Sequence, residues 1–324
     1  MVYNIAVSII CNTYNHEKYI RNTLNGFLKQ KTNFEFEILI HDDASTDNTQ
    51  KIIKEYEDTY SNIYPIYQTE NQYSKGIKIG EAFQYPRARG KYIALCEGDD
   101  YWIDEKKLQK QFDYMEQNPQ CTFCFTNGIA YKNNQFFQRI IPWLPENKIY
   151  FKDEKYDYNM GEIELLGYIP TASFFFRRDL FIKHPPLSEK SFRGDNFIKL
   201  YMTSLGYAHY INMDSCIYNY GVINSATTSW RNDEKMFLQS IERFISLIDD
   251  MNKLTDYKYE KQMLYSKLNW EIQKLFILKD KKTLKCKKYF NYAKSRRLKF
   301  FVKYILFCYL PIAYKCLKRI KDKG

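Results

Sequence analysis

Two adjacent carboxylates, Asp99 and Asp100, follow an apolar run at residues 92–96 and a glycine, Gly98. The apolar run predicts a buried strand, so the carboxylates are expected at its carboxyl end. In an α/β sheet that edge binds ligands, and a hard cation there is held by carboxylates together with substrate phosphates. The pair therefore predicts a site for a divalent cation and a phosphate-bearing ligand. The alternative is a solvated acidic turn that caps a helix beginning near Glu105.

Two further polar clusters follow predicted strands in the same way. Residues 12–15 follow the apolar run at 5–11, and residues 42–47 follow the run at 34–40. Because the carboxyl ends of parallel strands meet at one edge of a sheet, we expect all three clusters to form one site.

The elements that must position these clusters are strands alternating with helices. Strands are predicted at 5–11, 34–40, 63–68, 92–96 and 122–131, and helices at 16–29, 47–59 and 105–118. Asn15 is expected to cap the first helix, and Asp47 with Gln50 to form a capping box at the second. This order predicts an α/β fold with a mostly parallel sheet flanked by helices on both faces. A strand at 171–176, a helix at 195–205, strands within 210–220 and helices after 232 complete the pattern.

The charge is concentrated at the C-terminal end of the chain. The net charge is +11, but residues 280–324 contain 15 Lys plus Arg against 2 Asp, so the remainder is close to neutral. The 324 residues, 45% of them hydrophobic, suffice for a large domain with an extension. The 8 cysteines lie mostly in apolar stretches, and the pair Cys121 and Cys124 has neither a second pair nor a nearby His. They are interpreted as reduced thiols in a reducing cytoplasm, and no secretory signal is recognised.

The three clusters with their strands resemble glycosyltransferase family 2, whose members are inverting GT-A enzymes that use nucleotide diphosphate sugars. The matching segments are residues 7–15, 38–47 and 90–102, and Gly194–Asp195 extends the resemblance to about residues 3–225. The resemblance implies a GT-A-type, Rossmann-like domain at 1–230, with a nucleotide-binding half at 1–131 and an acceptor half at 132–230. Residues 231–324 are then a helical extension.

The resemblance also implies a catalytic centre. Asp100 is expected to bind a divalent cation, Mn²⁺ or Mg²⁺, and Asp99 to share that cation or face the ribose of the nucleotide. Asp195, at a predicted helix start, is the expected general base, with a helix N-cap as the alternative. Glu97 stands where many relatives have Asp, and its role is open.

Nucleotide and acceptor contacts are assigned to residues around this centre. Asp43 would accept the ring N–H of uracil, which favours UDP, whereas Asp42 is as well explained by loop turns. The other expected nucleotide contacts are Asn12 and Thr13 at the base edge, Tyr14 against the base, and Lys75 at the diphosphate. Tyr101 and Trp102 are either an aromatic shelf for the acceptor sugar or core residues.

The function predicted from this resemblance is transfer of a single sugar, preferably from a UDP-sugar, to a hydroxyl of a glycan or lipid-linked glycan. The enzyme would be an inverting hexosyl- or N-acetylhexosaminyltransferase in cell-surface polysaccharide biosynthesis. A sugar nucleotidyltransferase would instead need a Gly-rich basic loop at residues 12–15. A non-catalytic sugar-nucleotide or partner-binding protein would be favoured if Asp195 lay far from Asp100. Relatives often carry Tyr-Arg-x-His where this chain has Tyr218–Gly221, so Arg231 or a lysine is a possible substitute.

The tail at 296–324 mixes apolar and basic residues. Its uncharged run at 304–314 has 11 residues, against about 20 for a membrane span. The pattern predicts binding to anionic lipid at the inner face of the cell membrane, without crossing it and without a nucleic-acid partner. The alternative is a helix packed on the domain.

Overall fold

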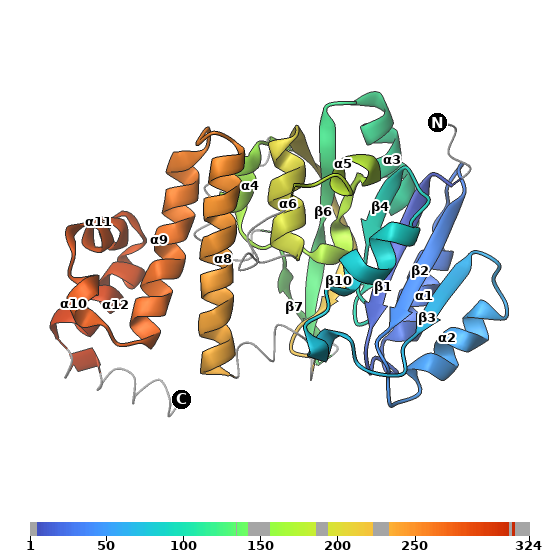
Figure 1. Ribbon diagram of the computed structural model, residues 1–324, viewed down its shortest axis with the longest axis horizontal. Coiled ribbons are helices and arrows are strands. Elements are labelled where there is room, and N and C mark those ends of the chain that lie inside the picture. Colours follow the sequence, from blue (N-terminus) through green and yellow to red (C-terminus); the bar gives the residue numbers. More distant parts are fainter. Residues whose placement is uncertain are drawn as a thin grey trace. The chain divides into compact units, whose positions relative to one another are not determined.

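The computed structural model in Figure 1 describes residues 5–133, 135–141, 156–185, 194–222, 233–310 and 313–314. The chain divides into two compact units. The first holds the described residues up to Val222, and the second holds those from Asp233 onward. Each unit is described by itself.

One mixed sheet forms the centre of the first unit. Its main path runs in the order β3 (Ile63–Tyr67), β2 (Phe36–Asp42), β1 (Val7–Thr13), β4 (Tyr92–Leu95), β9 (Phe175–Arg177), β6 (Cys121–Lys132), β10 (Tyr207–Asn219) and β5 (Tyr101–Trp102). The first four of these strands are parallel, and so are β6 and β10. The short strands β9 and β5 are antiparallel to their neighbours, as are two side strands, β7 (Gln135–Arg139) on β6 and β8 (Asp157–Tyr158) on β10. The expected α/β class is therefore confirmed.

Helices flank this sheet (Figure 1). They are α1 (Ile20–Leu28), α2 (Thr49–Glu57), α3 (Lys107–Gln117), α4 (Met160–Leu166), α5 (Arg178–Phe181) and α6 (Asp195–Ser204). Short helical turns occupy η1 (Tyr73–Lys75), η2 (Gly80–Gln84), η3 (Tyr85–Arg87) and η5 (Thr171–Ser173).

Two of the predicted helix caps are wrong. Asn15 has a positive φ of 56°, and its side chain accepts a hydrogen bond from the Thr46 amide instead of capping α1, which begins five residues later. The expected capping box of Asp47 and Gln50 is also absent, because the Gln50 amide donates to Asp42. In the first place a contact between two loops replaces the cap, and in the second a contact between α2 and the end of β2 does.

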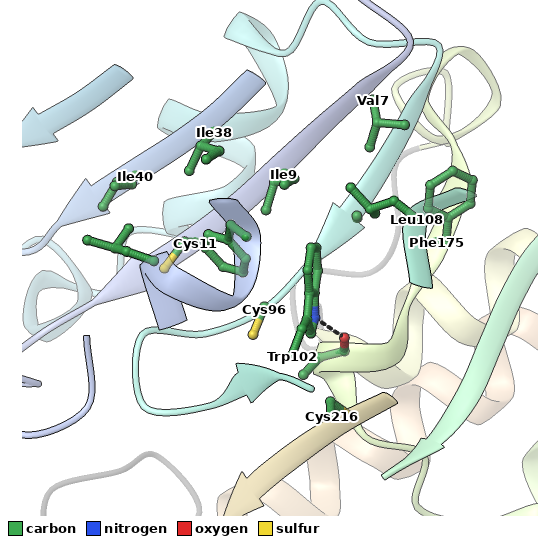
Figure 2. Close-up of a cluster of buried hydrophobic side chains, with 14 of the residues drawn as sticks. Val7, Ile9, Cys11, Ile38, Ile40, Cys96, Trp102, Leu108, Phe175 and Cys216 are labelled. Atoms are coloured by element: carbon green, nitrogen blue, oxygen red, sulfur yellow. Dashed lines mark hydrogen bonds between the residues drawn. The ribbon is translucent and has the colours of Figure 1, made fainter. Parts of the chain in front are cut away.

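The turn that carries Asp99 and Asp100, here called the acidic turn, leads directly into β5. Trp102 on β5 belongs to the buried core of the sheet (Figure 2). Trp102 on β5 is only 4% exposed; its indole N–H donates to the Ala172 carbonyl over 2.7 Å, and its ring lies 4.7 Å from that of Phe27. A Cβ on Gly26 would lie 2.8 Å from the Trp102 carbonyl oxygen, so only glycine lets α1 approach this closely. The core alternative therefore describes Trp102 in this structure.

A buried lysine underlies the same tryptophan. The Lys107 ammonium donates to Gln111 over 2.8 Å and lies 4.2 Å from the centre of the Trp102 ring. Because burial penalises the ammonium, the pKa of Lys107 is lowered to about 8.

This lysine should make folding stability depend on pH. Between about pH 8 and 10.5 the unfolded chain keeps a proton that folded Lys107 has lost, so the wild type gains stability as the pH rises. Lys107→Met lacks this gain. Across that pH window we expect the free energy of unfolding of the wild type, measured in urea, to rise by up to about 3 kcal/mol relative to that of Lys107→Met. Lys110→Met, at an exposed lysine on the same helix, is the control. A pH-independent difference for Lys107→Met would contradict the account.

The second unit is helical. It comprises α8 (Glu234–Leu254), α9 (Glu260–Ile277), α10 (Lys281–Leu284), α11 (Lys287–Ser295) and α12 (Leu298–Tyr309). The α8–α9 pair is fixed by stacking of Phe244 on Trp270, with ring centres 4.7 Å apart. One face of α12 is buried against α9 and α11, through residues that include Tyr304 and Phe307. In the part of the chain that the structure describes, no helix combines the length and apolar character needed to cross a bilayer.

Candidate active site

The three polar clusters meet at the end of β1. The Asn12 carbonyl accepts a hydrogen bond from the Gly98 amide over 2.9 Å, and the Thr13 carbonyl accepts one from the Asp43 amide over 3.0 Å. The end of β1 is thus bonded to the acidic turn on one side and to the loop after β2 on the other. The expected convergence of the clusters at one sheet edge is confirmed by these contacts.

The acidic turn is held from two sides. On α1, the buried Thr23 hydroxyl lies 2.6 Å from the Asp100 carbonyl and 3.1 Å from that of Gly98. On β10, the Asn219 backbone amide donates to Asp100 Oδ1 over 3.0 Å, while its side-chain amide donates to the Asp99 carbonyl. Asn219 stands where the family pattern expects Arg, so this chain has an amide clamp at that position. Arg231, the other suggested substitute, lies outside the described residues.

A histidine that the sequence analysis left without a role faces the turn. His16 Nε2 lies 3.9 Å from Asp99 Oδ2. A Cβ on Gly98 would lie 2.6 Å from Thr13 Oγ1 and 2.9 Å from His16 Nδ1, so the glycine permits this close packing. Both of those polar atoms are buried without a hydrogen-bond partner among the described residues. Since such atoms are normally satisfied, this corner suits a polar ligand. The only sequence signal for His16 is its place directly after residues 12–15.

The carboxylates of the site disfavour one another's charge. Burial and the neighbouring Asp99 charge raise the pKa of Asp100. Burial also raises the pKa of Glu97 to about 8, helped by the charges of Asp99 and Asp195 and opposed by hydrogen bonds from Asn12. A bound cation would relieve this crowding.

The residues present fit a divalent cation of the expected kind. In the described ranges, no group of three or more His, Cys, Asp and Glu side chains is arranged to hold a metal. Asp99 and Asp100 offer hard oxygen ligands. Mg²⁺-type sites commonly use one or two carboxylates and complete their shell with substrate phosphates and water. The donor set is therefore suited to a cation that binds together with a diphosphate.

The charge of Asp195 acts on Glu97, which precedes the acidic pair in the chain. Asp195 is the first residue of α6, and its Oδ1 accepts a hydrogen bond from the Asn196 amide over 2.8 Å. Burial raises the pKa of Asp195. The charges of both Asp100 and Asp195 raise the pKa of Tyr168. The role of Asp195 as the general base stays a prediction.

The expected nucleotide contacts surround this centre, and their roles stay predictions. The Asp43 carboxylate accepts hydrogen bonds from the Gln72 and Tyr73 amides, over 2.8 and 3.0 Å, and so anchors the segment that carries Lys75. Lys75 itself is exposed and forms an ion pair with Glu70.

The remaining predicted residues are placed as follows. Asn12 accepts a hydrogen bond from the buried Gln84 over 3.2 Å, and Tyr14 is partly exposed just beyond β1. Asp42 is engaged by Ser45 and Gln50, which agrees with the loop-turn alternative. Tyr101 is half-buried on β5, beside Trp102, and its acceptor role stays a prediction.

The amide clamp makes Asn219 a positioning residue with a measurable effect. Asn219→Ala keeps the backbone bond to the Asp100 carboxylate but removes the side-chain bond to the Asp99 main-chain carbonyl, so the turn that carries both carboxylates is held less firmly. Loss of partners that orient metal ligands typically costs 10- to 100-fold in metal affinity. We expect the Mn²⁺ concentration needed for half-maximal UDP binding to rise about tenfold. An unchanged Mn²⁺ requirement would show that the clamp has no such role.

The chain resembles one family of known proteins. The model of the family described as glycosyl transferase family 2 matches residues 8–183. The chain is 32% identical over 135 residues to WfgD of Escherichia coli, named as a UDP-Glc:α-D-GlcNAc-diphosphoundecaprenol β-1,3-glucosyltransferase; the match covers 42% of this chain and 50% of WfgD. Uncharacterised mycobacterial relatives share 46% identity over 120 residues, 37% of this chain, and the match spans only 34% of their length.

Solved structures show the same fold. Staphylococcus aureus TarS in complex with UDP-GlcNAc aligns with a TM-score of 0.62 at 17% identity, covering 94% of this chain and 82% of the TarS chain. The mannosyltransferase PcManGT from Pyrobaculum calidifontis, in complex with GDP-Man and Mn²⁺, aligns with a TM-score of 0.56 at 15% identity, covering 100% and 92%. The fold is thus the GT-A type expected from the sequence. Because the family model also spans more than half of its residues, the chain belongs to glycosyl transferase family 2.

Proposed function

We propose that the protein transfers a single sugar from a UDP-sugar to a hydroxyl of a glycan or lipid-linked glycan, with inversion at the anomeric carbon. The observation that carries this proposal is the backbone hydrogen bonding at the end of β1, which joins the acidic turn and the loop after β2 at one edge of the sheet. Carboxylates for a diphosphate-bound cation and residues for the nucleotide would then share this edge, and Asp195, whose charge acts on Glu97 there, is the proposed base.

In the proposed reaction the acceptor oxygen forms a bond to the anomeric carbon while the bond from that carbon to the diphosphate oxygen breaks. The acceptor proton passes to the Asp195 carboxylate, and the nucleoside diphosphate leaves from the opposite face. A single displacement of this kind inverts the configuration. The pKa of Asp195, raised by burial, makes it a stronger base than an exposed aspartate.

Asp100, with Asp99, would hold Mn²⁺ or Mg²⁺. When bound, the cation neutralises the negative charge that develops on the leaving diphosphate. The chain's own part is to fix the acidic turn through Thr23 and Asn219 and to hold the buried Asp100 carboxylate through the Asn219 amide, so that the diphosphate enters a prepared position. The Mn²⁺ in the PcManGT complex is consistent with this assignment.

Calorimetry tests which nucleobase the sugar donor carries. Asp43 supports UDP, and TarS was solved with a UDP-sugar, whereas PcManGT was solved with a GDP-sugar. UDP and, as the control, GDP are titrated into the protein with and without Mn²⁺. We expect UDP to bind, more tightly with Mn²⁺, and GDP to bind at least tenfold more weakly. Binding of GDP in preference to UDP would overturn the donor assignment, and binding of neither would overturn the proposed function.

The acceptor class is proposed from the relatives. WfgD is named for a lipid diphosphate-linked acceptor, and Bacillus subtilis TuaG for teichuronic acid biosynthesis. By analogy, the protein would be a hexosyl- or N-acetylhexosaminyltransferase in cell-surface polysaccharide biosynthesis, acting at the cytoplasmic face of the membrane.

Membrane association of the second unit is proposed for the outer face of α12. Its inner face is buried within the unit, as the packed-helix alternative expected, but Leu298 and Val302 on the outer face are 75% and 45% exposed. Exposed basic residues lie beside them, among them Lys299 and Lys303. Apolar side chains flanked by cations match an anionic lipid surface.

Vesicle sedimentation tests this surface. The wild type should sediment with phosphatidylcholine vesicles that contain phosphatidylglycerol and much less with phosphatidylcholine alone. A double variant, Leu298→Glu and Val302→Glu, should lose most of that binding. Leu264→Glu, at a leucine 46% exposed on α9 of the same unit, is the matched control. Equal sedimentation of all three proteins would exclude the outer face of α12 as the contact.

A further inference from the structure

Two buried polar atoms without a hydrogen-bond partner lie against the acidic turn. Thr13 Oγ1 and His16 Nδ1 are both next to Gly98, where a Cβ would lie 2.6 Å from the first atom and 2.9 Å from the second. Neither atom has a hydrogen-bond partner among the described residues. Because buried polar groups are normally satisfied, the two atoms point to a ligand or an ordered water at this corner of the site.

The main chain fixes His16 at this corner. Its amide donates to Thr49 Oγ1 over 2.8 Å, and its carbonyl accepts hydrogen bonds from the Tyr19 and Ile20 amides, each over 2.9 Å. The Thr49 side chain is in turn held by Asp47. His16 therefore has a set position between the end of β1 and α1.

The second ring nitrogen of His16 faces Asp99. Nε2 lies 3.9 Å from Asp99 Oδ2, and the two side chains are 14% and 15% exposed. That separation is too long for a hydrogen bond, and Nε2 makes no hydrogen bond to any described residue. Since an imidazole nitrogen can carry an N–H, Nε2 is a donor without an acceptor beside the proposed cation site.

A diphosphate at the acidic turn needs such donors in addition to the cation. N–H groups bind charged oxygens through short, charge-assisted hydrogen bonds. The family pattern expects Arg and His where this chain has Asn219 and Gly221. The backbone amide of Asn219 is bonded to Asp100 and its side-chain amide to the Asp99 carbonyl. The basic groups that the pattern expects at the end of β10 are therefore missing from these two positions.

We propose that His16 is a donor-binding residue, whose Nε2–H donates a hydrogen bond to a phosphate oxygen of the nucleoside diphosphate beside Asp99. The Thr13 hydroxyl, next to the same glycine, would donate to His16 Nδ1 directly or through one water and so keep the proton on Nε2. This inference rests on the proposed function, because it takes the acidic turn as the diphosphate site. It adds a residue that distinguishes the diphosphate from the nucleoside.

The test compares uridine with UDP, which share the base and the ribose, by calorimetric titration at increasing Mn²⁺ concentrations. We expect His16→Ala to weaken UDP binding by about tenfold or more, the usual effect of losing a hydrogen bond to a charged group. Uridine binding should be unchanged, and saturating Mn²⁺ should not restore UDP binding. His209→Ala is the matched control, because His209 is also 14% exposed and also lies beside an aspartate, Asp157. It should bind both ligands as the wild type does.

A second measurement observes the histidine nitrogen directly by nuclear magnetic resonance. The chain has only 4 histidines, so the ring signals of protein with isotope-labelled histidine can be assigned by substitution. The His16 signals are those absent from His16→Gln. With Mg²⁺ in place of the paramagnetic Mn²⁺, UDP should shift the Nε2 signal of His16 in the wild type, and uridine should not.

The outcomes separate this inference from the proposed function. A wild type that binds no UDP would count against the proposed function itself. A wild type that binds UDP no more tightly than His16→Ala does would overturn the inference alone. Recovery of UDP binding at high Mn²⁺ would overturn it too, because His16 would then act on the cation through Asp99, and so would an equal loss of uridine and UDP binding. Thermal melting shows whether each variant folds, and if His16→Ala does not, the His16 signal of the wild type decides.

Discussion

Asp195→Asn should lower the rate of sugar transfer by about 10²- to 10⁴-fold, the range that a positioned general base contributes. The substitution keeps the size of the side chain and its ability to accept the hydrogen bond from the Asn196 amide. It replaces the negatively charged carboxylate, which takes up the acceptor proton, by a neutral amide. UDP binding with Mn²⁺ should be retained, because the donor contacts are assigned to other residues.

The pH profile identifies the role of this group. A base must be ionised, and burial raises the pKa of Asp195, so wild-type transfer should rise with pH through that pKa and then level off. The Asn196 bond and the attraction of Lys199 oppose the shift without reversing it. In Asp195→Asn the residual rate should lack this acid limb.

Stability measurements separate catalysis from folding. When folding raises the pKa of a carboxyl group, the folded protein loses stability as the pH climbs from the pKa of that group in the unfolded chain through its pKa in the folded protein. Removing the charge should therefore leave the melting temperature at pH 8 unchanged or higher. Asp113→Asn, at an exposed aspartate on α3, is the matched control. Full activity of Asp195→Asn, or loss of activity through unfolding alone, would contradict its assignment as the base.

The parallel part of the sheet could be predicted because its signals are local. The strands β1, β2 and β4 consist largely of apolar, buried residues. This is expected of parallel strands whose sheet is covered on both faces. The short antiparallel strands were harder to predict. β5 has two residues and β9 has three, so pairing with neighbouring strands, and not intrinsic propensity, determines them.

The same distinction applies to the site. The positions of Asp99 and Asp100 after a strand, and of Asp195 at the start of a helix, could be predicted from local pattern, whereas their roles stay predictions. Asn219 could not be predicted, since its role depends on hydrogen bonds to residues 119 and 120 positions earlier in the chain. Its neutral amide gives no chemical signal in the sequence.

Asp100→Asn is expected to abolish the effect of Mn²⁺ on UDP binding. Asn is isosteric, so its oxygen still accepts the hydrogen bond from the Asn219 amide, but the side chain no longer carries the charge that attracts the cation. Transfer should fall about a thousandfold, equivalent to roughly 4 kcal/mol of lost transition-state stabilisation. Asp99→Asn should lose less transfer activity than Asp100→Asn if Asp99 faces the ribose, and as much if Asp99 shares the cation.

The readout for Asp100 is the shift in melting temperature that UDP and Mn²⁺ cause together. In the wild type the pair should raise it well beyond UDP alone, because a ligand that binds only the folded state stabilises by mass action. In Asp100→Asn the Mn²⁺-dependent part should vanish, whereas the exposed control Asp113→Asn should keep it. In the absence of UDP and Mn²⁺, Asp100→Asn should melt no lower than the wild type at neutral pH, because burial and the Asp99 charge already disfavour the ionised Asp100. An equal Mn²⁺ effect in both proteins would place the cation elsewhere and separate the acidic turn from diphosphate binding.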